Sequence, residues 1–152
     1  MSLLNEVPGI LFVDHVAIAV PQGQLEAQVA SYRALGFTEF HREDVLGKDQ
    51  VREVLLKIGG GPNLIQLLEP LTPDSPVAKQ IEKNGGRAGF AHIAYRVESA
   101  QQAFDAMRAA GFKIIDAAPR KGSRGTTVFF VHPKSTEAAP FGYLIEIVEE
   151  PA

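Results

Sequence analysis

The sequence predicts an α+β fold in which two paired βαβββ modules form a cupped, mostly antiparallel sheet. The first observation behind this prediction is a repeated strand. Residues Val13–Val20 and Phe90–Val97 are short apolar runs rich in β-forming residues, and each has one histidine in its third position, His15 or His92.

The second observation is that the distance between the two copies stays nearly constant along the chain. The landmarks compared are the strand histidine, the glycine that ends the following helix and a polar residue in the last strand. The separations between the two copies are 77 residues from His15 to His92, 75 from Gly36 to Gly111, and 80 from Gln66 to Glu146. Agreement over several landmarks indicates two copies of one unit. Units this small do not close a core alone, so they should pair.

The elements follow in the same order in both copies. In the first module we predict a strand at about 12–20, a helix at 24–35 ended by Gly36, and strands at 37–42, 51–58 and 64–69. The second module repeats this with a strand at 90–97, a helix at 100–110 ended by Gly111, and strands at 112–116, 126–131 and 143–148. We expect one domain over residues 1–152, with module 1 at about 11–71, a connecting helix at 74–84 and module 2 at 89–149.

Composition excludes several classes of protein. The 152-residue chain has a net charge of −3 and no cysteine, so it has neither a disulfide framework nor a thiolate metal site. No basic block would neutralise nucleic-acid phosphates, and no apolar run reaches the eighteen residues of a membrane span. We expect a cytoplasmic protein that binds neither nucleic acid nor membrane.

Four polar residues lie inside otherwise apolar strands: His15, Gln66, His92 and Glu146. Taken singly, each histidine reads as a hydrogen-bonded core residue, and Gln66 and Glu146 as residues that face water. Taken together, they occupy equivalent places in two copies, and burying them without partners would be costly. Two imidazoles, an amide oxygen and a carboxylate suit an octahedral divalent cation such as cobalt, manganese or nickel, with zinc also possible. The sequence therefore predicts that the sheet surrounds a metal site.

Six segments resemble the vicinal-oxygen-chelate (glyoxalase/bleomycin resistance/dioxygenase) superfamily, and within it the methylmalonyl-CoA epimerase family. The resemblance covers nearly the whole chain, and its segments are Asp14–Pro21, Gln66–Pro70, Asp74–Lys79, His92–Tyr95, His132–Ser135 and Leu144–Glu146. The Leu-Leu-Glu-Pro, Asp-Ser-Pro-Val-Ala-Lys and His-Pro-Lys-Ser motifs are the ones particular to the epimerases. By position, that family's metal ligands fall on His15, Gln66, His92 and Glu146, with cobalt as the first expectation.

The resemblance implies an enzyme that epimerises 2-substituted malonyl-CoA thioesters, methylmalonyl-CoA first among them, through a metal-stabilised enolate. Its two proton-transfer groups fall on Glu53 and Glu146. A carboxylate such as Glu53, on an apolar strand face, suits acid–base work because burial disfavours its charged form. The other reading is an exposed glutamate beside Arg52. Glu146 would serve as both ligand and base, although metal binding should lower its basicity.

The same fold and residues are also compatible with two other functions. A glyoxalase I-like lyase of lactoylglutathione would use the same fold and similar chemistry, and a bleomycin-resistance-type binding protein would keep the fold without a metal. An extradiol dioxygenase is disfavoured, since four protein ligands leave too little room for catechol and oxygen. The expected partner is a small acyl-CoA, and we expect a homodimer.

Several polar residues outside the ligand set have no assigned role in the chemistry. Four basic residues could meet coenzyme A phosphates or could be ordinary solvated charges: Arg120, Lys121, Arg124 and Lys134. His41 and His132 are interpreted as structural or exposed. The loop at 136–142 is longer than the short glycine connection expected, which leaves the acyl group open.

Overall fold

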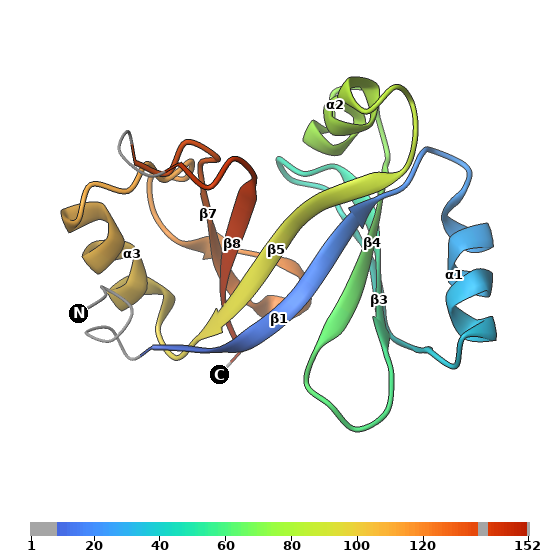
Figure 1. Ribbon diagram of the computed structural model, residues 1–152, viewed down its shortest axis with the longest axis horizontal. Helices are drawn as coiled ribbons and strands as arrows, with labels where there is room; N and C mark the ends of the chain where they lie inside the picture. The colour runs from blue at the N-terminus through green and yellow to red at the C-terminus, as the bar shows by residue number, and fades with distance from the viewer. Residues whose placement is uncertain (1–8, 137–139, 152) are drawn as a thin grey trace. The chain divides into compact units, whose positions relative to one another are not determined.

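The computed structural model describes residues 9–136 and 140–151. The loop at 136–142 therefore lies partly outside the described residues. The first module and the connecting helix comprise β1 (Ile10–Ala19), α1 (Leu25–Ala34), β2 (Thr38–Val45), β3 (Val51–Lys57), β4 (Leu64–Pro70) and α2 (Pro76–Lys83). The second module comprises β5 (Gly89–Val97), α3 (Ala100–Ala109), β6 (Arg120–Lys121), a 3₁₀ turn at Ser123–Gly125, β7 (Thr127–Val131) and β8 (Leu144–Glu149) (Figure 1). The predicted α+β class and the βαβββ order of both modules are confirmed.

The strand order is β2-β3-β4-β1-β5-β8-β7-β6 in one eight-stranded sheet. Each half of this order has the same internal pairing. The first strand of each module pairs in parallel with the last, β1 with β4 and β5 with β8, and the hairpins β3–β4 and β7–β8 are antiparallel. A tight hairpin cannot join parallel strands, so in each module the chain passes through a helix and two further strands before the last strand pairs with the first.

The described chain divides into two compact units, one of residues up to Asp14 and from His92 onward, the other of His15–Ala91. The unit His15–Ala91 holds most of the first module and α2, and the other unit holds the start of β1 and most of the second module. That the two units form a single domain stays a prediction.

In the unit His15–Ala91, α1 covers one face of the sheet. Leu25 and Val29 of this helix are 2% exposed and pack with Val54 and Leu67, which are fully buried. The opposite face carries the polar residues discussed below, and α2 packs near its end through Val77 and Ile81. The sheet of this unit thus has one apolar face covered by α1 and an opposite face that carries polar side chains.

The other unit repeats this plan. In it, α3 packs on β7 and β8, and Phe104 meets Phe129 edge-to-face with ring centroids 5.4 Å apart. Ser99 caps the helix because its hydroxyl accepts a hydrogen bond from the backbone N–H of Gln102 at 3.2 Å.

The glycines predicted to end two helices do so. Gly36 follows α1 with a φ of 102°, and Gly111 follows α3 with a φ of 90°. Side chains rarely adopt this left-handed backbone, so glycine is the residue that stops each helix at the equivalent place.

The predicted strand at 112–116 is wrong. In this stretch the structure has a single bridge, Ile114 to Val131, and the chain pairs with β7 again only at β6, inside the segment interpreted as a basic loop. Pro119 has no N–H for a ladder, and the buried Asp116 carboxylate accepts from the backbone N–H of Phe130 at 2.8 Å instead. Backbone pairing is therefore limited to two hydrogen bonds around the bridge, from Ile115 N–H to the Phe130 carbonyl and from His132 N–H to the Lys113 carbonyl, and the Asp116 side chain takes the next donor.

None of the helices in the described part of the chain has the length and apolarity needed to span a bilayer.

Candidate functional site

The pairing register places the four predicted ligands at equivalent positions. In the first module His15 lies opposite Leu64 and Ala17 opposite Gln66; in the second, His92 lies opposite Leu144 and Ala94 opposite Glu146. Gln66 is therefore diagonal to His15 as Glu146 is to His92. Diagonal neighbours on one sheet face are within reach of each other's side chains. The repeat read from the sequence is thus confirmed at the level of single residues.

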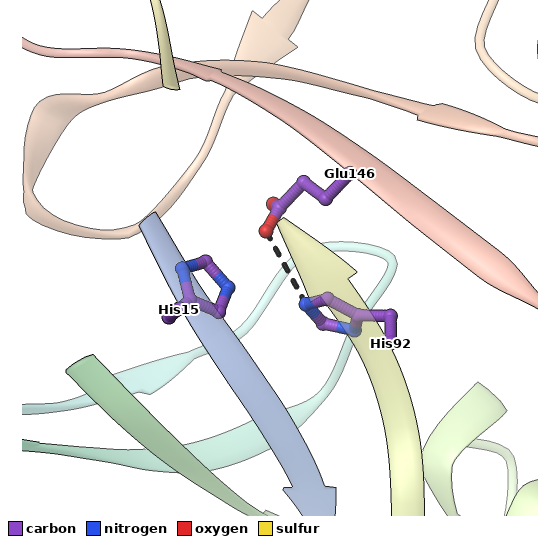
Figure 2. A group of neighbouring side chains, drawn as sticks. All are labelled: His15, His92 and Glu146. Carbon is purple, nitrogen blue, oxygen red and sulfur yellow. Dashed lines mark ion pairs between the residues drawn. The ribbon is translucent and has the colours of Figure 1, made fainter. Parts of the chain in front are cut away.

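Two of the four lie side by side on β5 and β8. His92 and Glu146 are buried, at 5% and 8% exposed, and His15, in the unit His15–Ala91, is buried at 5%. Figure 2 shows the His92 ring directed toward the Glu146 carboxylate, with His92 Nε2 3.3 Å from Glu146 Oε1. Two donors at right angles on an ion about 2.1 Å away lie about 3 Å apart, so this spacing fits shared coordination.

The His92 ring is held by an aromatic neighbour. It meets Phe130 edge-to-face, with ring centroids 5.3 Å apart, and Phe130 lies opposite Glu146 in the β7–β8 register. The packing limits the ways in which the imidazole can turn. A ligand held on its strand in this way costs less entropy when it binds a cation.

The fourth residue, Gln66, brings an oxygen of the right type. Its amide nitrogen donates a hydrogen bond to Glu53 Oε1, while its amide oxygen is buried and has no hydrogen-bond partner among residues 9–136 and 140–151. A buried amide oxygen without a partner is costly, and coordination to a cation would satisfy it. The donor set therefore fits a divalent cation with mixed nitrogen and oxygen ligands.

Glu53 is one of the most deeply buried charged residues described. Its side chain is 1% exposed and lies on β3 on the same face as Leu55, which pairs with Gln66. The sequence allowed an exposed glutamate beside Arg52, and that interpretation is wrong. Arg52 points away to the other face, where it forms an exposed pair with Asp44 at 2.8 Å.

A second group, which the sequence interpretation missed, surrounds Glu53. His41 and Glu43 on β2 each offer a ligand atom that lies within 4.8 Å of one another and of Glu53, and His41 Nε2 is 2.8 Å from Glu43 Oε1. Residues two apart in a strand share a face, so the sequence indicated that His41 and Glu43 lie on one face of β2. It did not show that they lie beside Glu53, because no residue repeated between the modules marks the register of β2 with β3.

The predicted basic cluster is partly engaged within the protein. Arg120 Nε lies 2.8 Å from Asp116 Oδ1, and Arg124 Nη1 lies 3.4 Å from Glu150 Oε1. Lys121 and Lys134 are exposed. Of the four residues, the two lysines are therefore the better candidates for an anionic ligand.

Comparisons with known proteins agree with this arrangement. Residues 14–130 match the family described as the Glyoxalase/Bleomycin resistance protein/Dioxygenase superfamily. The chain is 36% identical over 137 residues to an ethylmalonyl-CoA/methylmalonyl-CoA epimerase of Cereibacter sphaeroides, an alignment that covers 89% of this chain and 95% of the relative.

Solved structures show the same similarity in three dimensions. The methylmalonyl-CoA epimerase of Mycobacterium tuberculosis superposes with a TM-score of 0.83 and 33% identity, covering 94% of this chain and 89% of that one. A methylmalonyl-CoA epimerase in complex with methylmalonyl-CoA and ammonium gives 0.82 and 37%, covering 95% and 97%. From the matched family and these relatives, the chain belongs to the glyoxalase/bleomycin resistance/dioxygenase superfamily.

Proposed function

We propose that this chain is a divalent-metal-dependent epimerase of 2-substituted malonyl-CoA thioesters, with methylmalonyl-CoA as the first substrate. The observation that carries the proposal is the pairing of Glu53 with Gln66. It sets a buried carboxylate beside an amide oxygen of the ligand type, on the face that also bears His15. The relatives named above are epimerases of this substrate class, which supports the same reading.

The residues proposed to hold the cation are His15, Gln66, His92 and Glu146, with cobalt first and manganese, nickel or zinc as alternatives. When bound, a divalent cation supplies Lewis-acid stabilisation of the negative charge that develops on a thioester oxygen, worth several kcal/mol. The support is the burial of all four side chains, the position of Glu146 beside His92 in one unit and that of Gln66 diagonal to His15 in the other.

Epimerisation needs one group to take the α-proton and another to return a proton to the opposite face of the carbon. We assign these roles to Glu53 and Glu146. Glu53 suits the first because it is buried and oriented by the amide of Gln66. Glu146 faces competing demands, since its carboxylate is also a proposed ligand and lies 3.3 Å from His92.

The substrate class includes one clear alternative. The Cereibacter sphaeroides relative is described as acting on ethylmalonyl-CoA as well as methylmalonyl-CoA, so a 2-ethyl group belongs in the assay. For the coenzyme A phosphates, Lys121 and Lys134 are the proposed contacts. A homodimer and a cytoplasmic location stay predictions.

The test is deuterium exchange at the α-carbon. Purified protein is incubated with methylmalonyl-CoA or ethylmalonyl-CoA in D2O, and the product is read by mass spectrometry and by its chirality. Exchange with inversion should occur, stop on chelation and return with added cobalt. Absence of exchange with the cation restored would contradict the proposal.

Two parallel measurements separate the competing functions. Formation of lactoylglutathione from its hemithioacetal would indicate the glyoxalase reaction instead. Protein that binds no divalent cation by elemental analysis, after cobalt addition and gel filtration, would indicate a binding protein of the bleomycin-resistance kind.

A further inference from the structure

An enzyme with two proton-transfer groups ends each turnover with their protonation states exchanged. The group that took the α-proton holds it, and the group that delivered a proton has lost one. The same enantiomer can be processed again only after the first group has released its proton. Glu53 is 1% exposed, so this release needs a route through the protein.

We propose that His41 and Glu43 carry the proton between Glu53 and solvent from one turnover to the next. This inference rests on the proposed function, because Glu53 must first receive the α-proton. It assigns a role to a group of side chains that lies outside the proposed ligand set.

The register of two strands brings the three side chains together. Glu43 on β2 lies directly opposite Glu53 on β3, and His41 lies opposite Leu55, two residues along the same face. A bulge between Glu39 and His41 precedes these pairs, and from His41 to Val45 the register is regular. The ligand atoms of His41, Glu43 and Glu53 lie within 4.8 Å of one another, a span crossed directly or through one water.

Solvent exposure increases from Glu53 to the two side chains on β2. The side chains of His41 and Glu43 are 31% and 35% exposed, whereas Glu53 is 1% exposed. His41 Nε2 is 2.8 Å from Glu43 Oε1, so the two outer groups share a hydrogen bond. Solvent therefore reaches both outer side chains, while Glu53 lies at the buried end of the group.

The transfer is balanced in protons and needs no other reactant. The O–H bond of the Glu53 carboxyl breaks, and its proton passes to the His41 ring, either directly or by way of the Glu43 carboxylate, which passes it on across the 2.8 Å hydrogen bond between them. The protonated His41 ring then gives one proton to water or to a buffer base, so that His41 is neutral again and Glu53 is left as a carboxylate. The reverse sequence reloads Glu53 for the other enantiomer.

The experiment compares a single turnover with many. His41→Gln and Glu43→Gln are each assayed with enzyme in excess of methylmalonyl-CoA and then with substrate in excess, in D2O and with cobalt present. Arg52→Gln is the matched control, since it removes the Asp44–Arg52 pair from the same two strands on the opposite face.

We expect His41→Gln to keep its single-turnover rate within about twofold while the steady-state rate falls about tenfold or more, because only the return of the enzyme is slowed. Added imidazole should restore the steady-state rate, and Arg52→Gln should match the wild type in both assays. A variant that loses both rates together, or that keeps its steady-state rate, would overturn the inference. A wild type without any exchange would instead overturn the proposed function.

Discussion

The side-chain amide of Gln66 donates its hydrogen bond to the carboxylate of Glu53, which joins a proposed metal ligand to a proposed base. This contact orients both groups at once. The amide nitrogen faces the base, so the amide oxygen is left for the cation. Replacing Glu53 should therefore affect proton transfer and leave cation binding intact, whereas replacing Gln66 should affect both.

Replacing Glu53 by glutamine should abolish turnover and leave metal binding intact. The loss should be about 100-fold or more, since positioned acid–base groups contribute on this order. The measurement is α-proton exchange together with elemental analysis of cobalt. Glu26→Gln serves as the control, because Glu26 is an exposed carboxylate on α1. Retained activity would assign the base to another residue.

Replacing Gln66 by alanine should weaken both cation binding and turnover. It removes one oxygen donor and the hydrogen bond that orients Glu53. We expect cobalt affinity to fall about 10- to 100-fold, the range typical for groups that support a metal site. Titration calorimetry with cobalt measures the first effect and deuterium exchange the second. Unchanged cobalt affinity would remove Gln66 from the ligand set.

Replacing His15 or His92 by alanine should remove the cation. Each variant loses one imidazole of the proposed ligand set, and the remaining donors bind too weakly to retain the ion through gel filtration. Thermal unfolding with and without cobalt gives a second reading: at 100 times the dissociation constant a bound ion stabilises by about 2.7 kcal/mol. That stabilisation should vanish in both variants and persist in His132→Ala.

Replacing Asp14 by alanine should lower the free energy of unfolding. Asp14 is fully buried and pairs with Arg96 at 2.7 Å. Its loss leaves a guanidinium that is 15% exposed beside the exposed carboxylate of Glu150. Breaking a buried pair costs about 3 kcal/mol, measured by urea unfolding. Asp44→Ala removes an exposed pair and should change stability little. Equal effects of the two variants would contradict the burial argument.

The sequence by itself determined the repeat, because period-two apolar strands and helix-ending glycines are local properties of the chain. From them followed the α+β class, the order of nearly all elements, and the equivalence of Gln66 with Glu146. The strand predicted at 112–116 has a single bridge, because the Asp116 side chain accepts the Phe130 N–H and Pro119, further along, has no N–H to donate. Hydrophobic periodicity does not reveal a side-chain hydrogen bond of this kind.

Only the tertiary structure decided which polar residues face one another. The burial of Glu53 and its bond to Gln66 depend on the register of β3 with β4. The approach of His41 and Glu43 depends on the register of β2 with β3 after a bulge. Register is set by turns and packing between strands, and a shift of one residue turns every side chain to the other face.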